Sequence, residues 1–170
     1  MGNPSTAAVF LSRSPEDSDL LARALAAWAQ GGDVIALEGE LGTGKTVIAR
    51  AMAAALGVGG PVTSPTFGLI MEYHAASGGR FHHLDLYRIT GSEQALAFGI
   101  EEYLFDRQAI TVVEWPERIA DLLSAKDAGI GGRLLYVKLE HVSANRRRII
   151  LPAAFGTQIL AVIDRLRGSE

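Results

Sequence analysis

The sequence contains no cysteine among its 170 residues, which excludes a disulfide framework, an iron–sulfur site and a cysteine-ligated zinc site. It also lacks any uninterrupted apolar stretch close to the ~18 residues that cross a bilayer, and its first six residues lack the layout of a signal peptide. Basic residues are not in excess, since 16 lysines and arginines stand against 19 acids. That balance does not favour a protein that grips nucleic acid directly by its phosphates. We therefore expect a cytoplasmic protein that does not contact a membrane.

The composition is typical of one globular domain. Hydrophobic residues make up 48% of the chain and charged residues 21%, as in folded rather than disordered proteins. A chain of 170 residues leaves room for one domain, and it shows no internal repeat and no linker. We therefore predict a single domain over residues 1–170.

Apolar runs alternate with turn residues along the chain and predict strands that alternate with helices. The predicted strands are 7–11, 34–37, 67–73, 80–85, 109–113, 133–141 and 146–151. The predicted helices are 15–30, 46–56, 92–98, 100–105 and 155–166. Continuous apolar runs at 34–37 and 109–113 are typical of parallel strands covered on both faces, whereas the hairpins indicate antiparallel edges. The pattern predicts an α/β three-layer fold: a mainly parallel central sheet, antiparallel edge strands and helices on both faces.

A glycine-rich turn lies between the strand at 34–37 and the helix at 46–56. Residues 39–46 read Gly-Glu-Leu-Gly-Thr-Gly-Lys-Thr and match G-x-x-x-x-G-K-S/T, whose backbone N–H groups face a phosphate. In that motif the lysine, here Lys45, bridges the β- and γ-phosphates, and the following hydroxyl, here Thr46, ligates Mg²⁺. The plainer alternative is an ordinary turn, but the flanking strand and helix are the context that the motif requires. The predicted nucleotide contacts are Glu40, Leu41, Gly42, Thr43, Gly44, Lys45 and Thr46.

Chemistry on a bound triphosphate also requires an acid at the end of a neighbouring strand to hold the magnesium. Asp85 ends the predicted strand at 80–85 and Glu114 follows the apolar run at 109–113, although either could be an ordinary strand-end carboxylate. Glu114 follows the more continuous run, so we place its strand beside the loop and assign Glu114, with Thr46, as the metal ligand. Asp85 becomes the switch or water-positioning acid. The predicted catalytic residues are Lys45, Asp85 and Glu114, and we expect Lys45 to face solvent in the empty loop.

Other features of the sequence are better explained by structural or surface roles than by catalysis or metal binding. His82 and His83, with His74 nearby, form a weak transition-metal candidate because neighbours on a strand point to opposite faces, and we assign them a structural or surface role. The arginines at 146–148 fit a solvated hairpin better than a contact with RNA. The segment 64–66 is either a nucleotide-sensing switch or a turn. Trp115 is expected to cap the core beside the metal.

Five blocks of the sequence occur in the order of one known family. They are Gly-Glu-Leu-Gly-Thr-Gly-Lys-Thr at 39–46, Val-Thr-Ser-Pro-Thr-Phe at 62–67, His-Leu-Asp-Leu-Tyr-Arg at 83–88, Phe-Gly-Ile-Glu-Glu-Tyr at 98–103 and Val-Glu-Trp-Pro-Glu at 113–117. This order resembles the TsaE (YjeE) family, the ATPase component of bacterial threonylcarbamoyladenosine synthesis on tRNA. The resemblance covers about residues 11–118 closely. One departure is Arg50-Ala51, where members often carry Arg-Gly.

The resemblance implies a P-loop NTPase-type fold and a single ATPase domain that hydrolyses ATP to ADP slowly when isolated. Residues 39–46 would cradle the nucleotide, Thr46 and Glu114 would hold Mg²⁺, Asp85 would belong to the hydrolytic switch, and Trp115 would lie close to the nucleotide. The implied partners are TsaD, which modifies adenosine at position 37 of tRNA, and TsaB. The tRNA would be contacted only through that complex, which this family resets by hydrolysing ATP.

Two other functions remain open at this level. A small-molecule kinase would use the same loop, but such enzymes carry several arginines in a lid, whereas the cluster at 146–148 lies in a predicted hairpin. A nucleotide-gated scaffold would bind ATP without needing turnover. A regulatory GTPase is disfavoured because no Asn-Lys-x-Asp sequence occurs.

Overall fold

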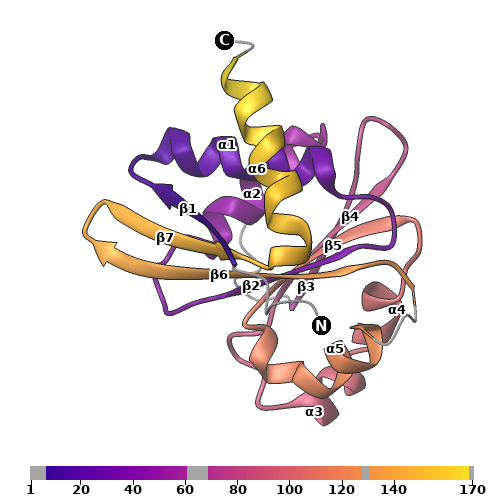
Figure 1. The fold of residues 1–170 in the computed structure, drawn as a ribbon. Helices are drawn as coiled ribbons and strands as arrows, with labels where there is room; N and C mark the ends of the chain where they lie inside the picture. Colours follow the sequence, from indigo (N-terminus) through magenta and orange to yellow (C-terminus); the bar gives the residue numbers. More distant parts are fainter. Residues whose placement is uncertain (1–6, 61–68, 128–130, 169–170) are drawn as a thin grey trace, which may run out of the picture.

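The computed structural model describes residues 7–60, 69–127 and 131–168, which form a sheet between two layers of helices (Figure 1). The strands of the described residues make one sheet in the order β1-β7-β6-β2-β5-β4-β3. Their bounds are β1 Ala8–Ser12, β2 Val34–Glu38, β3 Ile70–His74, β4 Arg80–Asp85, β5 Ala109–Glu114, β6 Leu134–Ser143 and β7 Arg146–Leu151. The helices are α1 Pro15–Trp28, α2 Lys45–Ala55, α3 Ser92–Ala97, α4 Ile100–Leu104, α5 Ala120–Asp127 and α6 Ala153–Arg167, with a 3-10 turn, η1, at Pro116–Ile119.

The centre of the sheet is parallel and its edges are antiparallel, as the sequence predicts. β2 pairs in parallel with both β5 and β6, and β5 pairs in parallel with β4. The pairs β1–β7, β6–β7 and β3–β4 are antiparallel. β2 is therefore an interior strand, and the loop that follows it emerges at the carboxyl edge, where α/β sheets place their ligand sites.

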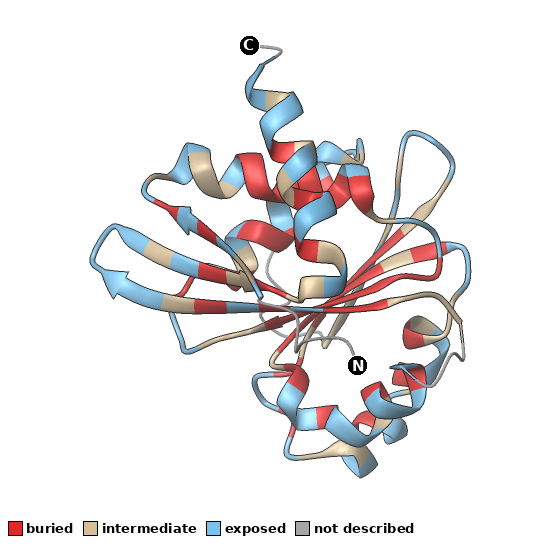
Figure 2. Cartoon of the chain, in the orientation of Figure 1, coloured by how far each residue is buried: buried red, intermediate tan, exposed pale blue. Residues whose placement is uncertain are grey.

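Each face of the sheet carries its own hydrophobic core. Ile35 and Leu37 of β2 pack with residues of α1, α2 and α6, whereas Val34 and Ala36 pack on the opposite face with residues of α3, α4 and α5. Figure 2 shows buried residues along the central strands and on the inward sides of both helical layers. This two-sided burial explains why β2 reads as a continuous apolar run rather than an alternating one.

Local signals set the ends of several elements. α1 starts at Pro15 because the Ser14 hydroxyl accepts a hydrogen bond from the Asp17 backbone N–H at 3.2 Å. The helix ends at Trp28, slightly before the expected stop at the following glycines, and Trp28 is a core residue as predicted. β4 has its predicted bounds.

The sequence did not reveal α5 or η1. α5 buries only Leu123 and Lys126 among its residues, so it lacks the apolar periodicity that identifies a helix. The block at 62–67, including the switch candidate at 64–66, and the first six residues lie outside the described residues. None of the helices in the described ranges combines the length and apolar character needed to cross a membrane.

Candidate functional site

The loop between β2 and α2 has the backbone shape of a phosphate cradle. Gly42 and Gly44 have φ angles of 78° and 104°, in the left-handed region that residues with a side chain rarely adopt. A Cβ built on either residue would have no neighbour within 4 Å. The loop therefore presents bare backbone toward open space, which leaves room for phosphate oxygens to approach its N–H groups.

Lys45, the first residue of α2, folds back over this loop. Its Nζ donates hydrogen bonds to the carbonyl oxygens of Gly39 at 2.6 Å and Glu40 at 2.8 Å. The side chain is only 4% exposed, so the expectation that Lys45 faces solvent is wrong. Physically, the two carbonyls give the ammonium hydrogen bonds that would otherwise come from water. Burial lowers the pKa of Lys45, while the carboxylates of Glu114 and Glu117 act in the opposite direction.

Thr46 and Glu114 meet at the carboxyl edge of the sheet. The Thr46 hydroxyl donates to Glu114 Oε2 at 2.9 Å, and Glu114 is 2% exposed. Glu114 ends β5, which lies directly beside β2, so the predicted placement of its strand is confirmed. A hydroxyl and a carboxylate are hard oxygen donors of the kind that Mg²⁺ prefers, and this pair fits that ion.

Asp85 lies one strand farther from the loop, at the end of β4 and in register with Glu114. Its Oδ1 accepts a hydrogen bond from the Tyr87 backbone N–H at 3.1 Å. Burial raises the pKa of Asp85 above its usual value, and the nearby charge of Glu114 acts in the same direction; the Tyr87 hydrogen bond, His83 and Lys45 oppose them. Asp85 is thus electrostatically coupled to both Glu114 and Lys45.

His83 is a site residue that the sequence reasoning missed. Its Nε2 lies 2.7 Å from Glu114 Oε1, and the side chain is fully buried. His82 points to the opposite face, as expected, and packs edge-on against Tyr103. The period of two already placed His83 on the face of Asp85, which is the signal that could have identified it. No cluster of three metal-binding side chains occurs among the described residues, so the transition-metal alternative has no support.

Trp115 directly follows Glu114 and lies beside the loop. It has a φ of 61°, a left-handed backbone seen at no other non-glycine residue of the described ranges. The centre of its ring lies 3.9 Å from Lys45 Nζ and 5.1 Å from the centre of the Tyr87 ring. Trp115 therefore lies next to the loop, and its place beside the metal and close to the nucleotide stays a prediction.

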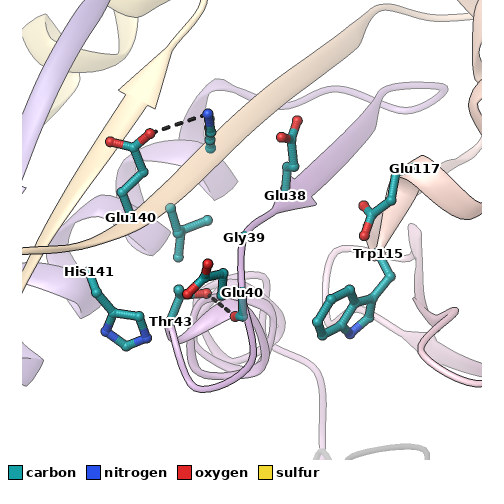
Figure 3. A pocket seen from close by; sticks show the side chains of 10 residues that line it. Glu38, Gly39, Glu40, Thr43, Trp115, Glu117, Glu140 and His141 are labelled. Atoms are coloured by element: carbon teal, nitrogen blue, oxygen red, sulfur yellow. Dashed lines mark hydrogen bonds and ion pairs between the residues drawn. The ribbon is translucent and has the colours of Figure 1, made fainter.

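Two cavities flank the loop, and their charges differ. The first, of about 520 Å³, is rich in carboxylates (Figure 3). It is lined by Glu38, Gly39, Glu40, Thr43, Trp115, Glu117, Lys138, Leu139, Glu140 and His141. The second, of about 550 Å³, adjoins Gly42 and Gly44 and is lined by Arg13 and Arg147 without a carboxylate. An anionic ligand on the loop is therefore favoured toward the second cavity.

The arginines at 146–148 lie at the start of β7. The Arg147 guanidinium donates to the Ser143 and Ala144 carbonyls of the preceding turn, and Arg148 lies 3.5 Å from Glu140. These contacts agree with the predicted solvated hairpin, and Arg147 also lines the second cavity beside Gly42 and Gly44, which the sequence did not indicate.

The comparisons with known proteins agree on one family. The family model "Threonylcarbamoyl adenosine biosynthesis protein TsaE" matches residues 12–149. A protein of Bacillus subtilis is 39% identical over 110 residues, covering 65% of this chain and 67% of that protein. A protein of Treponema pallidum is 33% identical over 125 residues, covering 74% and 90%. Both are named tRNA threonylcarbamoyladenosine biosynthesis protein TsaE.

The fold also resembles a solved structure. The crystal structure of Bacillus subtilis YdiB matches 98% of this chain and 99% of its own with a TM-score of 0.67 at 24% identity. That likeness, with the parallel sheet and the loop after β2, identifies the predicted P-loop NTPase-type fold. Because the family model spans most of the sequence, this chain belongs to the TsaE family of threonylcarbamoyl adenosine biosynthesis proteins.

Proposed function

We propose that this chain is the Mg²⁺-dependent ATPase of the machinery that makes threonylcarbamoyladenosine at position 37 of tRNA, acting with TsaD and TsaB. The observation that carries the proposal is the 2.9 Å hydrogen bond between Thr46 Oγ1 and Glu114 Oε2. It joins the phosphate-binding loop to the strand-end acid. Membership of the TsaE family supplies the pathway, and it gives no support to the small-molecule kinase alternative.

The residues of the loop have distinct roles in this proposal. The bare backbone around Gly42 and Gly44 binds phosphate oxygens through its N–H groups. The Lys45 ammonium exchanges its bonds to the Gly39 and Glu40 carbonyls for bonds to phosphate, so its hydrogen-bonding capacity stays satisfied. Thr46 and Glu114 would hold Mg²⁺, which when bound neutralises charge that builds up on the transferring phosphate.

Asp85 is proposed to position the attacking water. Burial and the neighbouring Glu114 raise the pKa of Asp85, which makes its carboxylate a better proton acceptor than an exposed aspartate at neutral pH. The Tyr87 N–H holds Oδ1 and so fixes the orientation of the group. We therefore expect a substitution at Asp85 to impair ATP hydrolysis without weakening ATP binding.

Both the net charge of the chain and its family membership support TsaD and TsaB as the proposed partners. The chain carries a net charge of −3, so tRNA is expected to be contacted through TsaD and TsaB rather than directly. Arg50 and Arg88 are exposed, and no arginine contact to Lys45, Thr46 or Glu114 is found among the described residues. Stabilisation of the transferred phosphoryl group commonly uses an arginine, so a partner would supply it and turnover by the isolated chain would be slow.

A binding and turnover experiment tests the proposal. Calorimetry measures ATP affinity, and phosphate release measures hydrolysis, each with wild-type protein and with Asp85→Asn. We expect Asp85→Asn to bind ATP as tightly as the wild type and to lose most of its turnover. Equal turnover in the two proteins, or no ATP binding by the wild type, would contradict the proposal. Transfer of phosphate to an added metabolite, without release, would instead support a kinase.

A further inference from the structure

His83 makes the second contact to the carboxylate of Glu114, on the side away from the loop. Its Nε2 lies 2.7 Å from Oε1, while the Thr46 hydroxyl lies 2.9 Å from Oε2. Both oxygens of Glu114 are therefore held, one by β4 and one by α2. His83 and Glu114 are 0% and 2% exposed, so water does not compete for either contact.

The chemistry of the two groups fixes the direction of the bond. An ionised carboxylate only accepts hydrogen bonds, so the His83 proton must be on Nε2. The other ring nitrogen, Nδ1, is buried and has no hydrogen-bond partner among the described residues. Within the described ranges the imidazole thus makes one polar contact, and that contact is to Glu114.

A polar ring in this position is costly for folding. Burying an unpaired polar atom destabilises a protein, and β4 places the apolar side chain of Phe81 two residues earlier on the same face of the sheet. An apolar side chain at position 83 would avoid that cost but would leave Oε1 of the buried Glu114 carboxylate without its donor. The histidine is therefore explained by Glu114, whose carboxylate it holds.

We propose that His83 is a positioning residue for the magnesium site: its Nε2–H holds Oε1 of Glu114 so that Oε2 stays aimed at Thr46. This inference rests on the proposed function, in which Glu114 and Thr46 hold the ion. The terminal torsion of a glutamate is broad, so loss of the imidazole leaves the carboxylate free to rotate and leaves Oε1 without its donor. Removing a partner that orients a metal ligand typically weakens metal binding about 10- to 100-fold.

The two adjacent histidines provide a matched pair of variants. His83→Leu removes the contact to Glu114, and His82→Leu removes a buried imidazole from the opposite face, where it packs on Tyr103. The measurement is calorimetric binding of a non-hydrolysable ATP analogue, with a titration of Mg²⁺ and in EDTA. We expect His83→Leu to raise the Mg²⁺ midpoint about 10- to 100-fold with unchanged affinity in EDTA. His82→Leu should leave both values unchanged.

Two further variants separate positioning from packing. His83→Gln places an amide N–H near the position of Nε2 and should restore most of the Mg²⁺ affinity, whereas His83→Asn places it near Nδ1 and should not. If His83→Leu does not fold, the comparison of His83→Gln with His83→Asn tests the inference by itself. A wild-type Mg²⁺ midpoint in both His83→Leu and His83→Asn, with a lowered melting temperature, would overturn the inference in favour of a packing role.

Glu114→Gln in the same assay separates the inference from the proposed function. If Glu114→Gln raises the Mg²⁺ midpoint and His83→Leu does not, the role of His83 is wrong and the proposed metal site stands. If neither variant changes the midpoint, the assignment of Glu114 as a metal ligand is wrong, and the role of His83 is overturned with it.

Discussion

The ammonium of Lys45 lies 3.9 Å from the centre of the Trp115 ring. A cation over an indole face is attracted by about 0.5–2 kcal/mol, and the same ammonium also donates to the loop carbonyls of Gly39 and Glu40. Trp115 is thus in contact with the side chain that phosphate binding is expected to redirect. The indole is placed to report on that event.

ATP binding should therefore change the fluorescence of Trp115. The chain has two tryptophans, and the other, Trp28, is the last residue of α1 and lies against Arg133 and against Phe155 of α6. We expect the wild type to show an emission change on titration with ATP and Trp115→Phe to show none, with Trp28 emission retained. A full response in Trp115→Phe would contradict the predicted coupling of Lys45 to the indole.

Lys45→Ala should weaken ATP binding by roughly ten- to a hundredfold, because a charge-assisted hydrogen bond contributes about 1.5–3 kcal/mol. It should also lower the melting temperature, since it leaves the Gly39 and Glu40 carbonyls without their donor. Calorimetry below the melting temperature of the variant measures the affinity. Arg50→Ala, an exposed position on the same helix, is the matched control. Wild-type affinity in Lys45→Ala would rule out the loop as the phosphate site.

Glu114→Gln should increase the Mg²⁺ requirement of hydrolysis more than Asp85→Asn does. The reason is position: Glu114 contacts Thr46, whereas Asp85 lies one strand farther from the loop. A Mg²⁺ titration of phosphate release gives the two midpoints. The reverse ranking would exchange the roles assigned to the two acids.

Asp85→Asn should stabilise the protein at neutral pH while it impairs turnover. The folded-state pKa of Asp85 is raised, chiefly by burial, so the folded chain binds this proton more readily than the unfolded chain does. The buried charge therefore destabilises the fold above that pKa, and the cost is relieved as the pH falls through it. Melting curves recorded from neutral pH downward should show an advantage for the variant that shrinks as the pH falls through the raised pKa of Asp85. A variant that melts below the wild type at neutral pH would contradict this.

TsaB and TsaD together should accelerate phosphate release, because none of the described arginines contacts Lys45, Thr46 or Glu114. The assay compares the isolated protein with the protein plus TsaB–TsaD, with and without tRNA. Fast turnover by the isolated chain that the partners do not change would argue for an independent enzyme.

The loop, its flanking elements and the parallel centre of the sheet could be predicted because each leaves a local signal in the sequence, namely the spacing of the glycine-rich motif and the continuous apolar runs of the central strands. The strand of Glu114 could be placed beside β2 from its continuous apolar run alone. The contact of His83 with Glu114 could not, because it joins residues 31 positions apart and depends on β4 pairing with β5. The buried position of Lys45 was missed for a related reason: its acceptors are backbone carbonyls, which any sequence provides.

The N-terminus of α2 has no side-chain cap, and this affects how strongly a bound nucleotide would stabilise the helix. Its N-cap is Gly44, which has no side chain to satisfy the first N–H groups of the helix, and a side-chain cap typically contributes about 0.5–2 kcal/mol. A phosphate bound in the loop would serve as the missing cap. Because Ile48 and Met52 of α2 belong to the same core as Leu21 and Leu25 of α1, nucleotide binding would slow amide hydrogen exchange through both helices, well beyond the residues it touches.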